Sequence, residues 1–218
     1  VRQAINRKYK TQGVTFGHIS QQGLIELSKQ QVLGDLKNCD ISFCESCVLG
    51  KQKRVKFSKG KHSSKGVLDY VHSDLWGPAR TETLGGGRYF LSIIDDYSRR
   101  VWVYVLKHKS DTFKKFQEWK VLVENQTEKK VKKLRTDNGL EFCNHEFDKF
   151  CKENGIARHL TIPGTPQQNG LAERMNRTLL ERVRCMLATS GMPKKFWGEA
   201  VSTAAYLINR CPSSAIQM

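Results

Sequence analysis

The chain contains 218 residues, enough for one substantial domain and a small module. Its 37 lysines and arginines outnumber 21 acidic residues, and the net charge of +16 favours a polyanionic partner, with simple solubility as the alternative. No apolar run approaches the ~20 residues of a membrane-spanning helix. No charged-then-apolar leader precedes the first segment, so we expect neither a membrane protein nor a secreted one.

The first fifty residues are polar and contain one predicted helix, Gln21–Gln31. Beyond it, Cys39–Gly50 is predicted to be a knuckle-like loop that contains Cys44 and Cys47. Their Cys-x-x-Cys spacing is common in structural zinc sites, and His18 adds a third ligand of suitable chemistry. Without a leader a disulfide framework is not expected. The remaining downstream thiols are therefore predicted to be reduced packing residues: Cys143, Cys151, Cys185 and Cys211.

Basic residues are concentrated in two stretches rather than spread evenly. Seven lysines and arginines and no acid lie between Lys51 and Lys65, in a Lys- and Ser-rich segment that is predicted to be a linker. The second cluster consists of Lys129, Lys130, Lys132, Lys133 and Arg135, and it leads along the chain to Asp137. Basic groups near a candidate catalytic acid suit a phosphodiester substrate.

From about residue 67 the pattern changes to strands alternating with helices. The predicted strands are Leu68–Asp74, Tyr89–Asp95, Val101–Leu106, Val131–Thr136 and Arg158–Ile162. The predicted helices are Asp111–Asn125, His145–Asn154 and a long one from Thr165 to about Ser190, followed by another. Short turns between the first three strands predict an antiparallel meander, and helical connections to the last two predict parallel neighbours. The fold class is therefore α/β, with a mixed five-stranded sheet and flanking helices.

Three acids lie where such a sheet would bring them together. Asp74 ends the first predicted strand, and Asp137 ends the fourth, before the turn Asn138-Gly139. Glu173 is predicted in the second turn of the helix that Thr165-Pro166 opens. Two strand ends and one helix can converge at the carboxyl edge of the sheet. Hard divalent cations prefer such oxygen ligands, and two of them can clamp a phosphodiester during phosphoryl transfer.

Other interpretations of these acids stay open at this stage. A single Asp at a strand end is most often a solvated turn residue. Glu173 and Arg177 are i, i+4 neighbours and can form a salt bridge on a solvent face. Three further carboxylates compete for the same role: Asp95, Asp96 and Glu141.

The sequence motifs around the acids are more specific than the acids themselves. They include the segments Ser73–Pro78, Arg135–Gly139 and Pro163–Arg174, together with Ile94–Arg99, Phe196–Ala200 and Tyr206–Arg210. Over nearly its whole length the chain resembles the integrases of copia-type LTR retrotransposons. The resemblance implies a ribonuclease H-like fold in which Asp74, Asp137 and Glu173 are catalytic and bind two Mg²⁺ or Mn²⁺ ions.

The same resemblance implies an activity, partners and a location. The expected activity is divalent-metal-dependent strand transfer of element DNA ends into target DNA, by an assembled homo-oligomer. The expected location is intracellular, in the nucleus after assembly in cytoplasmic particles. The residues that we expect to contact DNA are Lys51, Lys53, Arg54, Lys56, Lys132, Lys133, Gln167, Asn169 and Arg177.

Copia-type integrases begin with a His-His-Cys-Cys module that binds structural zinc. His18 matches the second histidine, but Gly13 stands where the first would be, so a fourth ligand is missing. Cys39, His62 or a water molecule are the candidate replacements. Two smaller departures from the family pattern are Leu140 and Gln168.

These observations predict four parts: a degenerate GAG-pre-integrase or zinc-type helical module over residues 1–55, a basic linker over 56–66, a catalytic core over 67–190, and a truncated carboxyl-terminal helix of the core over 191–218. We expect the chain to be a piece of a longer polyprotein. Two alternative functions are a catalytically inactive or domesticated nucleic-acid-binding remnant and a ribonuclease H-like nuclease, which would use the same acids with water as the nucleophile.

Overall fold

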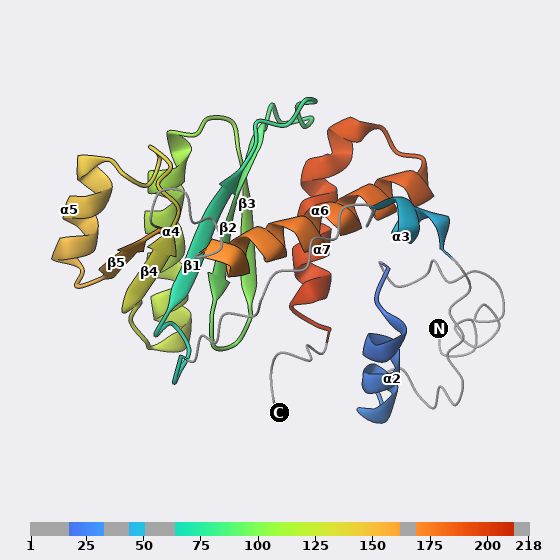
Figure 1. Ribbon diagram of the computed structural model, residues 1–218, viewed down its shortest axis with the longest axis horizontal. Helices are drawn as coiled ribbons and strands as arrows, with labels where there is room; N and C mark the ends of the chain where they lie inside the picture. Colours follow the sequence, from blue (N-terminus) through green and yellow to red (C-terminus); the bar gives the residue numbers. More distant parts are fainter. Residues whose placement is uncertain (1–17, 33–43, 51–63, 162–168, 212–218) are drawn as a thin grey trace.

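The computed structural model describes residues 18–32, 44–50, 64–161 and 169–211 (Figure 1). The amino-terminal part contains the helices α2 (Gln21–Lys29) and α3 (Glu45–Gly50). The larger part contains, in chain order, β1 (Val71–Trp76), β2 (Tyr89–Asp95), β3 (Val101–Leu106), α4 (Asp111–Thr127), β4 (Lys133–Thr136), α5 (His145–Glu153), β5 (Ala157–Leu160), α6 (Gly170–Ser190), the short 3₁₀ helix η2 (Lys194–Phe196) and α7 (Trp197–Ile208).

The five strands form one mixed sheet in the order β3-β2-β1-β4-β5. Strand β2 runs antiparallel to both β1 and β3, as predicted. Strand β4 runs parallel to β1 and to β5, to which it is joined through α5. The predicted mixed sheet is therefore confirmed, and the parallel pairing brings the carboxyl ends of β1 and β4 to the same edge.

Helices cover the two faces of this sheet separately (Figure 1). Leu91 and Ile93 of β2 point into the cluster formed with α4 and α5, whereas Phe90 and Ile94 point into the cluster formed with α6 and α7. This alternation follows from the two-residue period of a strand. On the second face α6 contacts β1 and β2, and α7 contacts β3, so α6 lies directly over the strand that contains Asp74.

Strand β1 begins three residues later than the predicted 68–74, so Asp74 lies within the strand rather than at its end. Leu68 is fully buried but has a left-handed φ of 65°. Its N–H donates to Asp95 Oδ1 (2.8 Å) and its carbonyl accepts from Lys132 N–H (3.1 Å). Val131 is likewise buried although it lies outside β4, and its N–H donates to the Glu124 carboxylate instead of to a neighbouring strand. Side-chain acceptors thus replace ladder partners at these two apolar positions.

Two predicted helical features also need correction. The described part of α6 begins at Gly170 with Asn169 at the N-cap position, which places Glu173 in the first turn and not in the second. The predicted cap at Thr165-Pro166 lies outside the described residues. The helix ends as predicted at Gly191, which has a φ of 66°. Within the predicted knuckle-like loop, Glu45–Gly50 is the helix α3.

Among the described helices, none combines the length and the apolar character needed to cross a membrane.

Asn209, just after α7, completes the backbone hydrogen bonding of edge strand β3. Its Oδ1 accepts from Val101 N–H (2.8 Å) and its Nδ2 donates to Val101 O (2.7 Å). Replacing Asn209 by Ala leaves both groups without this partner and should lower the free energy of unfolding by about 1–2 kcal/mol. The control Asn125→Ala, at an exposed position in α4, should change it by less than ~0.5 kcal/mol. Urea unfolding followed by circular dichroism measures both, and equal midpoints would contradict this role of Asn209.

Candidate active site and zinc-type site

The three predicted acids approach one another at one edge of the sheet. Asp74 lies in β1, and Asp137 directly follows β4, its parallel neighbour. Glu173 comes from the first turn of α6, which packs on β1. The charges of both Asp137 and Glu173 act on Asp74, and the charge of Asp137 also acts on Glu173. The three acids therefore lie within electrostatic range of one another at this edge of the sheet. Whether their carboxylates come close enough to share metal ions stays a prediction, because the metal-binding group found among the described residues is His18, Cys44 and Cys47.

Their proximity has an electrostatic cost, which the pKa values report. Burial and, to a smaller extent, the negative charges of Asp137 and Glu173 together raise the pKa of Asp74 to about 7, although hydrogen bonds from Leu75 and Asn176 lower it. Burial also raises the pKa of Glu173, the positive charge of Arg177 lowers it, and Asp137 raises it again. Without a cation the site therefore holds more negative charge than its own hydrogen bonds compensate.

Two buried asparagines on α6 and at its start fix the position of Asp74. Asn176 Nδ2 donates to Asp74 Oδ2 (2.8 Å), while the Leu75 N–H donates to Asp74 Oδ1 (3.0 Å). Asn169 Nδ2 donates to the carbonyl of Ser73 (3.2 Å). Asn169 is only 1% exposed, so in this structure its side chain joins the helix to β1, whereas we expected it to contact DNA. The sequence analysis did not identify Asn176. Its position one turn after Ala172, on the helix face that is buried, could have indicated a polar contact with the sheet.

The turn after β4 positions Asp137. The Gly139 N–H donates to Asp137 Oδ1 (3.1 Å), and Asn138 Nδ2 donates to the carbonyl of Thr161 (2.7 Å). A Cβ on Gly139 would lie 2.6 Å from the carboxylate of Glu141 and 3.1 Å from Asp137 Oδ1. Glycine therefore leaves room for the Asp137 carboxylate in this turn.

Asp95 and Asp96, which competed for the catalytic role, are buried at the end of β2 and at the start of the following turn. Asp95 accepts from Leu68 N–H and from the backbone and hydroxyl of Ser98. Burial raises the pKa of Asp96, but hydrogen bonds from His72 and Ser64 and the charge of Arg99 outweigh burial and bring the pKa to about 2. Protein donors therefore bind both of these carboxylates, and the pKa of Asp96 is lowered, whereas the pKa values of Asp74 and Glu173 are raised.

The donor set at the sheet edge suits a hard divalent cation. Three carboxylates from different elements supply oxygen ligands, and their mutual repulsion would be relieved by a bound cation. Mg²⁺ and Mn²⁺ are the ions whose chemistry fits such a site.

The lysines around the start of β4 lie at the opposite end of this strand from Asp137. Lys132 and Lys133 stand at the start of β4, whereas Asp137 follows its end, a separation of ~13 Å along an extended strand. Lys132 is 66% exposed and forms an ion pair with Asp69 (2.6 Å), and Lys130 pairs with Glu124 (3.1 Å). Lys133 is exposed, and the two-residue period of a strand places it on the same face as Arg135 and Asp137.

The other residues expected to contact DNA divide into two groups. Arg177 lies near Glu173, since its charge lowers the pKa of that acid. The rest lie outside the described residues: Lys51, Lys53, Arg54, Lys56 and Gln167.

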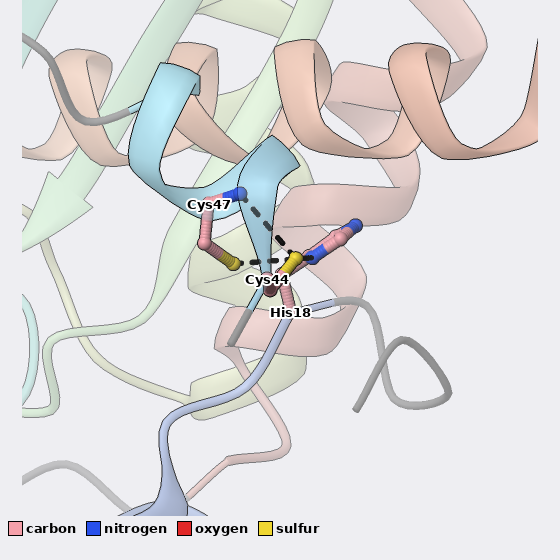
Figure 2. Close-up of side chains that lie close together, drawn as sticks. All are labelled: His18, Cys44 and Cys47. Atoms are coloured by element: carbon pink, nitrogen blue, oxygen red, sulfur yellow. Dashed lines mark hydrogen bonds between the residues drawn. The ribbon is translucent and has the colours of Figure 1, made fainter. Parts of the chain in front are cut away.

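A second site lies in the amino-terminal part (Figure 2). His18 Nδ1 lies 3.2 Å from Cys47 Sγ and 3.6 Å from Cys44 Sγ, and the three ligand atoms all lie within 4.8 Å of one another. The expected approach of these residues is confirmed. Ligands bound to one tetrahedral zinc ion at 2.0–2.3 Å are ~3.5 Å apart, so two thiols and one imidazole nitrogen in this arrangement fit zinc. Gly13 and the candidate fourth ligands Cys39 and His62 lie outside the described residues.

Comparison with known proteins gives two family matches. Residues 66–166 match the family described as "Integrase core domain", and residues 15–52 match the family described as "GAG-pre-integrase domain". The first range contains the five-stranded sheet with Asp74 and Asp137 and ends before Glu173, and the second contains His18, Cys44 and Cys47.

Two of the curated relatives are plant transposon polyproteins. The chain is 49% identical over 90% of its length to the retrovirus-related Pol polyprotein from transposon TNT 1-94 of Nicotiana tabacum. It is 34% identical over 80% of its length to the corresponding polyprotein from transposon RE2 of Arabidopsis thaliana. The chain spans only 15% and 12% of the length of these two relatives.

Among solved structures, a chain of the simian T-cell lymphotropic virus intasome in complex with PP2A regulatory subunit B56 gamma has a similar fold. The TM-score is 0.56 at 17% identity, and the match covers 89% of this chain and 66% of that one. This similarity identifies the sheet and its helices as an integrase-like fold.

The raised pKa of Asp74 predicts how stability depends on pH in metal-free buffer. Between pH ~4 and pH 7 the folded state retains a proton that the unfolded state has lost. The free energy of unfolding should therefore fall as the pH rises through this window, by at most about 1.4 kcal/mol per unit. Asp74→Asn should remove most of this dependence and stabilise the protein at pH 7.5. The control Glu141→Gln removes a charge near Asp137 and should retain it. A wild-type stability that rises from pH 5 to pH 7, or an unaltered profile in Asp74→Asn, would contradict the assignment.

Proposed function

We propose that this chain, which belongs to the integrases of copia-type LTR retrotransposons, joins the ends of element DNA to a target DNA by metal-dependent strand transfer. The observation that carries the proposal is the convergence of Asp74, Asp137 and Glu173 from β1, β4 and α6, with enough mutual repulsion to contribute to a pKa of about 7 at Asp74. Such a cluster is unfavourable unless a cation occupies it, and it is the ligand chemistry of a two-metal phosphoryl-transfer site.

In this proposal the protein's own residues hold and orient the ligands. Asp74 and Asp137 would each bind a divalent cation, and Glu173 would complete the pair. Two Mg²⁺ or Mn²⁺ ions, when bound, supply a Lewis acid for the attacking and the leaving oxygen. Asn176 keeps the Asp74 carboxylate directed to the site, and the Gly139 N–H does the same for Asp137. Both contacts reduce the motion of the ligands before any substrate binds.

The proposed reaction replaces one phosphodiester with another. The 3′-hydroxyl of an element end attacks a target phosphorus atom, a new P–O bond forms, and the P–O bond to the target's own 3′-oxygen breaks. The attacking hydroxyl loses its proton and the leaving oxygen gains one. Because the bonds made and broken are of the same kind, no nucleoside triphosphate is required.

The proposal extends to partners and to a second metal. The net charge of +16 supports binding to element and target DNA. Assembly as a homo-oligomer is proposed by analogy with the intasome that shares the fold. Target DNA implies action in the nucleus after assembly in cytoplasmic particles. We also propose that His18, Cys44 and Cys47 hold a structural zinc ion.

Two other functions use parts of the same structure. A ribonuclease H-like nuclease would use the same acids with water as the nucleophile, but the GAG-pre-integrase match ahead of the core favours integration. A non-catalytic DNA-binding remnant is favoured by Gly13, which stands where the family has a zinc-binding histidine. The three acids argue against it, because a protein that only binds DNA has no use for half-buried carboxylates that repel one another.

A strand-transfer assay on element-end oligonucleotides with Mn²⁺ tests the function directly. Asp137→Asn should reduce joined product by at least about 100-fold, because a metal ligand is lost. The control Glu141→Gln alters a carboxylate in the same loop and should retain activity. Hydrolysed but unjoined product would indicate the nuclease, and an active Asp137→Asn variant would refute the site.

The salt dependence of DNA affinity tests the role of the lysines before β4. The logarithm of the affinity should fall with the logarithm of the salt concentration, by about 0.9 per phosphate contacted. Changing Lys129, Lys130, Lys132 and Lys133 to Gln should flatten this slope and retain the fold, since all four are exposed. A variant with four other exposed lysines changed to Gln supplies the control for net charge: Lys107, Lys109, Lys149 and Lys152. Equal slopes in the two variants would mean that the four lysines from Lys129 to Lys133 make no specific contribution. An affinity independent of salt would mean that the net charge serves solubility.

A further inference from the structure

The imidazole of His18 links two separate parts of the molecule. Its Nδ1 faces the sulfur atoms of Cys44 and Cys47, at 3.6 and 3.2 Å (Figure 2). Its other nitrogen, Nε2, lies 3.2 Å from Oγ1 of Thr189, which belongs to the last turn of α6. One side chain therefore contacts both the proposed zinc site and the helix whose first turn contains Glu173.

The two contacts of His18 are chemically coupled. A histidine that binds a metal through Nδ1 is neutral, so its remaining proton is on Nε2. That N–H requires an acceptor, and a hydroxyl oxygen at 3.2 Å is a suitable one. Partners of this kind fix the ring orientation and the tautomer of a metal-binding histidine. Metal binding at Nδ1 would thus favour the contact with Thr189, and the contact would favour metal binding.

The backbone also places these groups together. His18 has a left-handed φ of 59°, an uncommon conformation for a residue with a side chain. Helix α3, which contains Cys47, packs against α6 (Figure 1). The contact between Thr189 and His18 therefore lies at a wider junction between the amino-terminal part and the core.

From this arrangement we propose that Thr189 is the positioning residue of the zinc-type site, and that metal bound there fastens the amino-terminal module to the carboxyl end of α6. The inference rests on the proposed zinc site, but it does not depend on strand transfer. Zinc would then stabilise part of the integrase core as well as the module that binds it.

The role of Thr189 as a positioning residue can be tested by zinc titration of the whole chain against a chromogenic chelator. Co²⁺ absorption serves as a check of thiolate ligation. Wild type should bind about one ion, and Cys44→Ser should abolish this binding. Thr189→Val removes only the hydroxyl and should weaken affinity by about tenfold, the lower end for such partners, because the contact is exposed. Thr189→Ser should restore it to within about threefold of wild type. The control Thr178→Val makes the same change at another exposed position of α6 and should have no effect.

Hydrogen exchange tests whether bound zinc fastens the amino-terminal module to the carboxyl end of α6. In wild type and Thr189→Ser, zinc should slow exchange of the amides at 187–191 as well as of those in α3, whereas in Thr189→Val protection should remain at α3 only. A Thr189→Val variant with wild-type affinity, or zinc protection confined to α3 in wild type, would overturn the inference while leaving the zinc site standing. No binding by wild type, or undiminished binding by Cys44→Ser, would overturn the zinc site and the inference together.

Discussion

Repulsion among three carboxylates is the constraint around which this fold is arranged. Asp74 is half-buried beside two other acids, and the loss of hydration together with their charges brings its pKa to about 7. Separation would relieve the repulsion, so the surrounding structure has to prevent it. Parallel pairing of β1 with β4 holds the two aspartates at one edge, and the packing of α6 on β1 holds Glu173 opposite them. Two buried asparagines, Asn169 and Asn176, join that helix to β1. A cation would turn this unfavourable cluster into a stabilising one.

The sheet and the identity of the acids follow from local signals. The short turn between β2 and β3 leaves only antiparallel pairing for these two strands, and the helices between the later strands are typical of parallel crossovers. The end of a short apolar run followed by Asn138-Gly139 marks the carboxyl edge of β4, and so the position of Asp137. Family-specific wording around Asp74 and Glu173 then selects those two acids among many. These features are encoded within a few residues of where they act.

Other features depend on partners distant in the sequence, and local patterns did not reveal them. Leu68 has the character of a strand residue, but Asp95 and Lys132 bind its backbone outside the ladder. Lys132, a proposed DNA contact, also forms an ion pair with Asp69, 63 positions earlier in the sequence. Asn176 resembles an ordinary polar helix residue until β1 is placed beneath it, 102 positions away in sequence. Each of these features is a polar contact whose partner only the tertiary fold supplies.

Helix α6 is the element on which both sites depend. Its first turn contributes Glu173, its second turn holds Asp74 through Asn176, and its last turn contacts His18 through Thr189. Glu173 and Thr189 are ~24 Å apart along a helix of 1.5 Å per residue. Over that distance neither site can affect the other through its charge, because the Debye length at physiological salt is about 8 Å. Any mutual influence must therefore pass through the position of α6 as a rigid body, and the interface of α6 with β1 and α7 limits that movement. The packing of one helix thus determines whether the two sites behave independently.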